Sequence, residues 1–240
     1  MVDALHAVGA REQIRDRIAE IERQIDDKRY HPGPWDRLLK DARALPREER
    51  EALKEEISRV SSKLHRRDGR ATLSLTTGMV AECAVALLGG ILVLFAIDNH
   101  SNLLAIIAAG LWTMTFQPRV KIAVGYALGV EYEYAYLYNF EPRFKMRFGD
   151  YIAAPRWARI LLHLSGTIGS PLGAWLVLVC LPADLKIAIV VCWAIFWIVV
   201  AVNVAGFIAA LAGVRKLGPM KASASSGGTA ALELREALEM

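Results

Sequence analysis

Three polar residues inside long apolar stretches have the types and spacing that could do chemistry: Glu82, Ser170 and Asn203. Each is 11 or 12 residues from an arginine near the end of its stretch, so in helices all three would lie at a similar depth, roughly 18 Å from those arginines. A carboxylate, a hydroxyl and an amide at one depth could handle a cation or a proton, and ionisable residues inside a membrane are functional candidates. The competing interpretation is that Glu82 is protonated and hydrogen-bonds Asn203 or Ser170, a contact worth about 0.6 kcal/mol.

Small residues lie on the same helical faces as these polar residues. Glu82, for example, is in helical register with Gly78, Ala86 and Gly89. Because small residues let membrane helices approach closely, we expect the polar side chains to point into a bundle rather than toward lipid. The glycines predicted to pack helices in this way are Gly166, Gly169, Gly173 and Gly206. The GTIGSPLG segment is also a candidate pore element, since broken helices line transporter sites, although packing is the commoner cause.

His163 is the only histidine inside an apolar stretch, and we assign it to the shallow side of the same transmembrane polar layer. A haem b site needs two axial ligands at similar depth, and His100 lies toward the opposite side, so a haem would need a symmetry partner. A hydrogen bond near the interface is the commoner role for such a histidine. The three cysteines lack metal-ligand spacing, and Asp98 with His100 offers too few ligands. No metal and no cofactor are therefore predicted.

Sequence signatures of common enzymes are absent. The chain has no GxxxxGK[ST], GxSxG, HExxH or CxxC pattern, and these are the spacings that phosphate binding, nucleophilic catalysis and metal catalysis require. The chain is therefore predicted not to be an enzyme. An intramembrane enzyme acting on lipid through Glu82, His163 and Asp150 is the least favoured alternative.

The helices that must position these residues can be predicted from the uneven distribution of charged residues along the chain. Residues 1–70 carry 17 of the 29 Lys and Arg and 15 of the 25 Asp and Glu, whereas residues 71–117 carry only Glu82 and Asp98. A purely soluble protein is excluded, because it would expose such concentrated apolar surface to water. Four transmembrane helices are predicted, at about 71–97, 103–117, 158–181 and 187–214. The second is short for a hydrocarbon core of roughly 30 Å unless it continues past Pro118.

Lys and Arg next to these stretches predict the orientation in the membrane. One side carries nearly all of them and the other side only Lys186. Positive residues favour the cytoplasmic side, so both termini are predicted to be cytoplasmic, in the inner or plasma membrane if the source is bacterial. The residues on the predicted cytoplasmic side are Arg66, Arg67, Arg70, Arg119, Lys121, Arg156, Arg159, Arg215 and Lys216.

Residues 1–70 are predicted to form a cytoplasmic helical hairpin. Two apolar series, beginning at Ile14 and at Leu53, each repeat with the 4, 3, 4 spacing of a coiled-coil seam. The HPGP sequence at 31–34 separates them, and Pro46 is suited to a helix start. An antiparallel hairpin is the simpler interpretation and pairing between chains is the alternative. The predicted fold is thus mostly α: a polytopic membrane protein with four transmembrane helices and an N-terminal coiled-coil-like hairpin.

The four-helix transmembrane domain, 71–217, includes an aromatic and basic cytoplasmic segment at 118–157. Tyrosine near Arg and Lys settles at headgroup interfaces, so we expect this segment to lie against the membrane or on the hairpin. Alternating tyrosines also fit a short strand. The segment's acidic residues argue against a nucleic-acid partner. The predicted interface residues are Tyr132, Tyr134, Tyr136, Tyr138, Arg143 and Arg147.

The tail, 218–240, begins with a Ser/Gly-rich linker, which is expected to be mobile, and ends in a short amphipathic segment. An isolated helix of about ten residues is unstable without a partner.

Two functions are compatible with these features. The first is a homo-oligomeric membrane protein that forms a channel-like or transport pathway for ions or small solutes, with Glu82 lining it. The second is a non-catalytic membrane subunit or scaffold that recruits partners through the hairpin and the Tyr-rich segment. Both predict the lipid bilayer as a partner; the first requires self-association and the second requires protein partners on the cytoplasmic face.

Overall fold

A computed structural model describes residues 2–67, 69, 71–138, 141–214, 216–217, 220–221 and 226–238. Most of the described chain is helical. The predicted boundary residues Arg70 and Arg215, and linker residues 222–225, lie outside the described residues.

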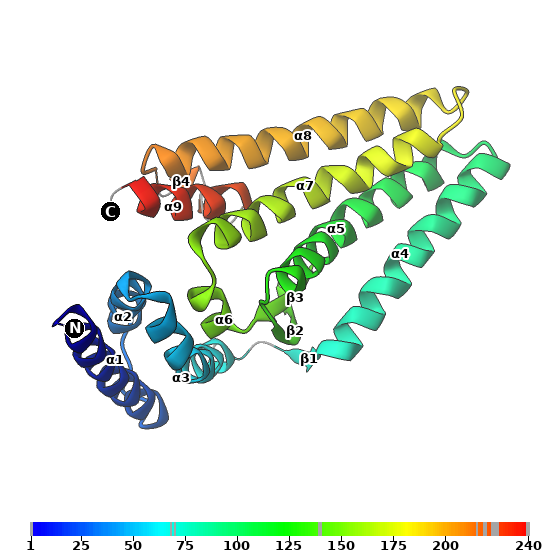
Figure 1. The fold of residues 1–240 in the computed structure, drawn as a ribbon. Coiled ribbons are helices and arrows are strands. Elements are labelled where there is room, and N and C mark those ends of the chain that lie inside the picture. Colours follow the sequence, from blue (N-terminus) through cyan, green and yellow to red (C-terminus); the bar gives the residue numbers. More distant parts are fainter. Residues whose placement is uncertain are drawn as a thin grey trace.

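Four long helices form the body of the molecule: α4 (Leu75–Asp98), α5 (Asn102–Ala127), α7 (Arg156–Cys180) and α8 (Lys186–Leu211). Each is long and apolar enough to cross a membrane. They lie in the order α4, α5, α7, α8, and the short connections α4–α5 and α7–α8 are at the same end (Figure 1). Large apolar side chains on the flanking helices are exposed, including Leu87, Leu94, Val190 and Ile198. This is the surface expected of helices surrounded by lipid.

The second apolar stretch is longer than its hydropathy alone indicates. Helix α5 runs without interruption through Pro118 to Ala127, a length of 26 residues. Pro118 has no N–H to donate to the carbonyl four residues earlier, but a membrane helix packed by neighbours tolerates that loss. The stretch therefore reaches the length that a hydrocarbon core requires.

Close contact between α5 and α7 depends on glycine. A Cβ atom on Gly169 would lie 2.8 Å from Gln117 Cα, and one on Gly173 would lie 2.4 Å from the backbone of Trp112. Side chains there would push the helices apart, so these glycines allow backbone-to-backbone packing within one chain. Gly166 on α7 and Gly206 on α8 are also buried.

The N-terminal region contains three helices: α1 (Val2–Asp26), α2 (Pro34–Ala44) and α3 (Arg47–Arg67). The two predicted seams bury together in one core with apolar residues of α2. Ion pairs between α1 and α3 advance in the same direction along both helices: Arg11–Glu49, Arg15–Glu56, Glu22–Arg59 and Asp26–Lys63.

The seams are therefore parallel, and the antiparallel hairpin expected from the sequence is wrong. The 11 residues of α2 form a helix roughly 16 Å long, which carries the chain back before α3 begins. The spacing of apolar residues in a seam does not encode this return.

The aromatic segment forms strands, which the sequence offered as its alternative. Strands β1 (Thr72–Ser74), β2 (Tyr132–Tyr138) and β3 (Glu141–Met146) make an antiparallel sheet in the order β1-β2-β3. A Cβ atom on Gly78 would lie 2.3 Å from Ala135 Cβ, so the sheet packs directly on the start of α4. The short helix α6 (Phe148–Ala153) then leads into α7.

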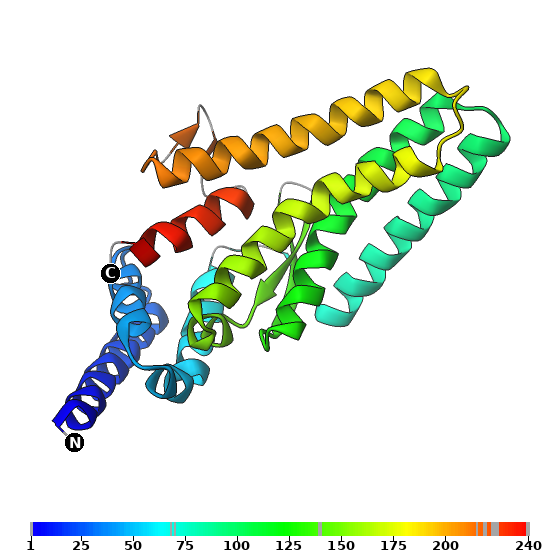
Figure 2. The ribbon, with the colours of Figure 1, turned by 45° about the horizontal axis from the view of Figure 1, so that its top comes forward.

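The C-terminal helix α9 (Ser226–Leu238) lies beside α7 and α8 (Figures 1 and 2). Two-residue strands β4 (Lys216–Leu217) and β5 (Met220–Lys221) precede it. Ala230 and Ala231 are fully buried, so α9 approaches its neighbours through small side chains. Packing on α7 and α8 supplies the partner that a helix of this length needs.

Candidate functional site

Five buried or partly buried polar residues meet where the N-terminal helices, α6, α7 and α9 come together. We call this group the junction cluster: Arg43, Tyr151, Arg159, His163 and Glu233. Glu233 is at its centre, with a side chain that is only 5% exposed. Arg159 Nε donates to Glu233 Oε2 at 3.0 Å. Arg43 Nη2 lies 3.2 Å from Glu233 Oε1, which also accepts a hydrogen bond from the Tyr151 hydroxyl.

The junction cluster continues from Tyr151 to His163. The Tyr151 hydroxyl lies 3.0 Å from His163 Nε2, and the two rings meet edge to face. Burial, together with the charge of Glu233, raises the pKa of Tyr151 well above its ordinary value, so the hydroxyl remains a donor. His163 Nδ1 is buried without a hydrogen-bond partner among the described residues.

The chemistry of the junction cluster is recognition of a carboxylate. Two guanidinium groups and a phenol surround one carboxylate, the geometry in which charge-assisted hydrogen bonds are strong. These residues come from α2, α6, α7 and α9, so the cluster joins the N-terminal helices and the C-terminal helix to a long apolar helix. Removing the Glu233 carboxylate would leave the buried Arg159 guanidinium without its counter-charge, a cost of about 3–5 kcal/mol.

A second polar contact joins α3 to the sheet. Lys145 Nζ on β3 donates to Ser61 Oγ at 2.7 Å, and the Tyr134 hydroxyl lies 2.9 Å from His65 Nδ1. Ser62 also donates to Glu133. Burial lowers the pKa of Lys145 to about 8. The sheet is thus attached to α3 by side chains that point inward.

The tyrosines predicted to form an interface are largely internal. Tyr132 and Tyr134 are buried, and the Tyr132 hydroxyl donates to the Lys121 carbonyl at 3.0 Å. The Tyr136 ring lies edge-on to His65. The side chain of Tyr138 lies outside the described residues.

The two predicted interface arginines lie close to this sheet. Arg143 pairs in register with Tyr136 on β2. Arg147 follows β3 and forms ion pairs with Glu55 of α3 and with Glu131. The segment therefore packs on α3 and α5, in agreement with the expectation that it could lie on the N-terminal helices.

Glu82 is buried in the contact between α4 and α5, and it differs from Glu233 because its carboxylate accepts no hydrogen bond from the described residues. Its residue exposure is 3%, and neither carboxylate oxygen has a partner among the described residues. Arg119 Nη2 donates to the backbone carbonyl of Glu82 instead, and Arg119 Nε is buried without an acceptor in the described part of the chain. Trp112 Nε1 donates to the Ala86 carbonyl at 2.9 Å and holds the two helices together.

The described hydrogen bonds do not join Glu82, Ser170 and Asn203. Asn203 Nδ2 donates to the Val199 carbonyl of its own helix at 3.0 Å, and Ser170 is buried on α7. Helices α5 and α7 lie between α4, which carries Glu82, and α8, which carries Asn203 (Figure 1). The equal depth that spacing predicts does not by itself place residues of the two flanking helices in contact.

Asp150 and His163 likewise have separate roles. Asp150 Oδ2 accepts from the Glu131 backbone N–H at 3.2 Å, whereas His163 bonds Tyr151. Glu82 lies on another helix, so the described hydrogen bonds do not assemble these three residues into one site.

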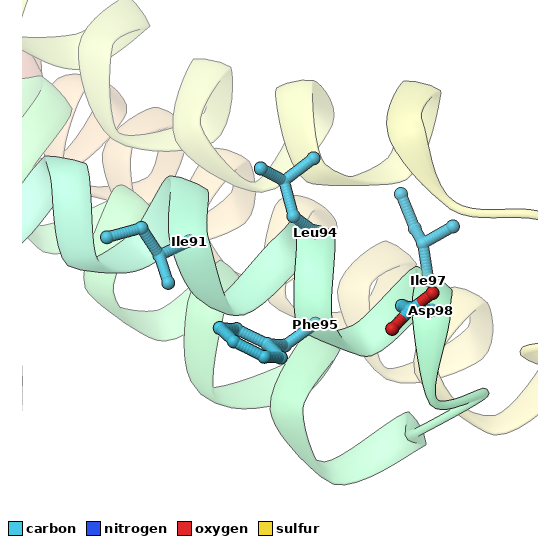
Figure 3. Close-up of a pocket in the computed structure, with 5 residues that line it drawn as sticks. All are labelled: Ile91, Leu94, Phe95, Ile97 and Asp98. Carbon is cyan, nitrogen blue, oxygen red and sulfur yellow. The ribbon is translucent and has the colours of Figure 1, made fainter.

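Two hollows lie on α4. One, about 400 Å³, is formed by α4 and α5 and is lined by Cys83, Ala86, Leu87, Trp112, Phe116 and Arg119. The other, about 480 Å³, is lined by residues of α4 alone, which Figure 3 shows near the α4–α5 connection: Ile91, Leu94, Phe95, Ile97 and Asp98. Only the first combines apolar walls with a basic side chain.

The part of the chain that the structure describes contains no group of three or more His, Cys, Asp or Glu side chains that could hold a metal ion. Comparisons with protein families, curated proteins and solved structures gave no match for this chain.

The residues that sequence reasoning missed are Arg43, Tyr151 and Glu233. Arg43 and Glu233 are separated by 190 residues, and each lies in a charged, amphipathic stretch where a solvent-exposed position is the ordinary expectation. The signal that could have found Glu233 is its place directly after the apolar series Ala230, Ala231 and Leu232, on a helix too short to be stable alone.

Proposed function

We propose that this chain is a non-catalytic integral membrane protein that anchors a cytoplasmic helical module to the bilayer and presents that module to partner proteins. The module consists of α1, α2 and α3. In this proposal α4, α5, α7 and α8 cross the membrane, with both termini on the cytoplasmic side. The excess of Lys and Arg at one end of the four helices supports this orientation.

The observation that carries the proposal is the junction cluster. Arg43 belongs to the module, Arg159 to an apolar helix and Glu233 to the C-terminal helix, and all three meet in one buried group. A module that merely trailed from a flexible linker would need no such contact. Fixing it to the membrane helices is useful where its orientation toward a partner matters.

Small-residue packing also favours this function over assembly of identical chains. Gly78, Gly89, Gly169 and Gly173 face elements of their own chain. Small residues of this kind are also the positions through which membrane helices of separate chains can associate. Because they are already occupied within one chain, the membrane helices retain large apolar side chains on their outer surfaces.

The surface offered to a partner would be the outer face of α1. Gln13, Asp16, Arg17 and Glu20 are exposed there, whereas the opposite face is buried in the core of the module. A mixed-charge helical face favours a partner with complementary charges, which set its orientation and rate of association.

The test is native mass spectrometry of the full chain extracted gently from its own membranes. Stoichiometric foreign subunits are expected with the wild-type chain and are expected to be lost with the Asp16→Lys/Glu20→Lys variant. A matched control is Lys186→Gln, which changes charge at the other end of the four helices. Identical chains alone in the wild-type complex would contradict the proposal.

A conduit for ions or small solutes is the second candidate, and Glu82 favours it. A buried carboxyl group without a hydrogen-bond partner is a common feature of ion and proton paths in membranes. Because α5 and α7 are packed through glycine in one chain, the path would form between α4 helices of neighbouring chains.

The conduit is tested by ion flux into liposomes that contain the purified chain. Wild-type flux is expected to change in Glu82→Gln while assembly is unaltered, and the exposed glutamate variant Glu20→Gln serves as the control. Absence of flux from the wild-type chain, or equal flux from Glu82→Gln, would exclude this role.

A further inference from the structure

The hollow between α4 and α5 has a basic end and an apolar body. Arg119 lies at one end, while Phe116, Trp112 and Leu87 line the rest. Its volume, about 400 Å³, is in the range of ligand-binding pockets. Leu87 is 69% exposed, so the hollow opens sideways from the helices rather than into the core of the chain.

Arg119 carries unused hydrogen-bonding capacity at this site. Its Nη2 donates to the Glu82 carbonyl, and its guanidinium lies over the Phe116 ring. Its Nε–H has no acceptor in the described chain. The Glu82 carboxylate forms no hydrogen bond with it, since both carboxylate oxygens lack partners among the described residues, although the two charges are near enough to interact electrostatically. The guanidinium therefore has no bonded counter-charge from the described residues, although a buried donor normally requires a partner.

The position of Arg119 along α5 matches the level of lipid headgroups. Helix α5 begins at Asn102, 17 residues earlier, which corresponds to about 25 Å of helix. A hydrocarbon core is roughly 30 Å thick, so a core that begins near Asn102 ends close to Arg119. A long arginine side chain can reach the remaining distance to the interface.

Phe116 and Trp112 are closer to the middle of the membrane than Arg119. Trp112 is seven residues before Arg119, or roughly 10 Å deeper. An occupant aligned with the hollow would thus have its polar end at Arg119 and its apolar end against Phe116, Trp112 and Leu87. A phospholipid of the cytoplasmic leaflet has this polarity and enters from the side.

We propose that the α4–α5 hollow is a binding site for one anionic phospholipid, with its phosphate on Arg119 and an acyl chain along Phe116 and Trp112. Arginine suits this role because its planar group of donors matches phosphate oxygens. A headgroup without a positive charge adds no repulsion at Arg119, so phosphatidylglycerol should be preferred over phosphatidylcholine. The proposal rests on the membrane embedding proposed above, but not on the partner-binding or conduit roles.

The test is native mass spectrometry of the full chain in detergent with equal amounts of phosphatidylglycerol and phosphatidylcholine of the same acyl chains. We expect one phosphatidylglycerol to be retained in preference to phosphatidylcholine. Arg119→Gln should lower its retention about tenfold, as expected for the loss of a charge-assisted hydrogen bond. Lys186→Gln, which removes a positive charge far from the hollow, should leave retention unchanged.

Two further variants separate the hollow from simple charge. Cys83→Trp places a large ring in the hollow and should reduce retention even though Arg119 remains. Arg119→Lys keeps the charge without the planar group of donors, so intermediate retention is expected. Thermal unfolding of each variant checks that the chain is folded, and Arg119→Lys provides the result if Arg119→Gln does not fold.

Three results would overturn the proposal. Equal retention of the two lipids by the wild-type chain would indicate annular lipid only, and equal retention by folded wild-type, Arg119→Lys and Cys83→Trp chains would show that the hollow is not the site. Full competition by glycerol phosphate would indicate a site for a free anion. Extraction of the chain from membranes by alkaline carbonate tests the embedding itself. A chain that remains embedded but shows no lipid preference would contradict only the lipid site.

Discussion

Two buried glutamates differ in whether their carboxylates have hydrogen-bond partners. Glu233 in the junction cluster is bonded by Arg159 and Tyr151 and contacts Arg43. Glu82, between α4 and α5, is buried to a similar degree but has no hydrogen-bond partner for either oxygen among the described residues. The first arrangement holds α2, α6, α7 and α9 together, whereas the second leaves polar side-chain atoms available to a bound ligand or another molecule.

The difference follows from which elements surround each residue. Three helices from separate parts of the chain, α2, α6 and α7, supply donors around Glu233 of α9, so its charge can be compensated. Glu82 faces one neighbouring helix, and the arginine of that helix bonds the Glu82 backbone instead of its side chain. Stability is therefore expected to depend strongly on Glu233 and weakly on Glu82.

The largest effect should come from Glu233→Gln. The substitution removes the negative charge from a buried group that contains two arginines, and we expect a loss of about 3–5 kcal/mol in the free energy of unfolding. Thermal and denaturant unfolding of the purified chain in detergent measure it. Glu20→Gln, an exposed glutamate on α1, is the control and should change stability by less than about 0.5 kcal/mol.

A double-mutant cycle sharpens the same point. Arg159→Gln should cost less in the Glu233→Gln background than in the wild-type chain, because the two residues share one interaction, with a coupling energy of up to about 3 kcal/mol. Additive losses would mean that the two residues stabilise the fold separately, and the junction cluster would not act as a unit.

Tyr151→Phe should have a smaller effect. It removes one hydroxyl that bonds both Glu233 and His163 while preserving the ring, so a loss of about 1–2 kcal/mol is expected. The measurement is the change in unfolding free energy relative to Phe148→Leu, which alters the neighbouring ring without removing a hydrogen bond. A neutral result would place the stabilising energy of the cluster in its two arginines alone.

Lys145, in the contact between α3 and the sheet, predicts a dependence of stability on pH. Its pKa is lowered to about 8 by burial, although Glu133 nearby opposes the shift. The unfolded chain binds this proton more tightly, with an ordinary lysine pKa near 10.4, so stability should rise as the pH increases from about 8 toward 10. Comparison with Lys145→Met across this range isolates the effect, because the variant lacks that increase.

The smallest effect is expected from Glu82→Gln. Because its carboxylate oxygens make no hydrogen bonds, replacing them should change the free energy of unfolding by less than about 1 kcal/mol. A loss as large as that of Glu233→Gln would contradict the comparison and would indicate that the Glu82 carboxylate has a partner in the purified protein.

Much of the architecture could be predicted from particular residues. The long series of apolar residues that surround Glu82 and Asn203 identifies helices able to cross a membrane, because length and hydropathy are local properties. The HPGP break and Pro46 indicated where the N-terminal helices are separated, for the same reason. The alternation of Tyr132, Tyr134 and Tyr136 is compatible with the strand β2, although the sequence favoured an aromatic segment at the membrane surface or on the N-terminal helices.

The candidate site could be predicted only in part. Spacing predicts a shared depth for Glu82, Ser170 and Asn203, but depth along a helix does not determine which helices are neighbours. The direction of α3 relative to α1 depended on α2 folding back. The position of Glu233 depends on the packing of α9 against α7 and α8. No local sequence pattern predicts that packing.

By itself, then, the sequence determined which segments are apolar, where the N-terminal helices are separated, and how charge is distributed between the two ends of the long helices. These properties depend on residues close together in the chain. Only the tertiary structure decided that Arg43, Arg159 and Glu233 share one buried site. It also decided that Glu82 and Arg119 have polar side-chain atoms without hydrogen-bond partners among the residues that the structure describes. Charge compensation acts over a few ångströms in space. Residues almost two hundred positions apart in the sequence come within that distance only when the whole chain is folded.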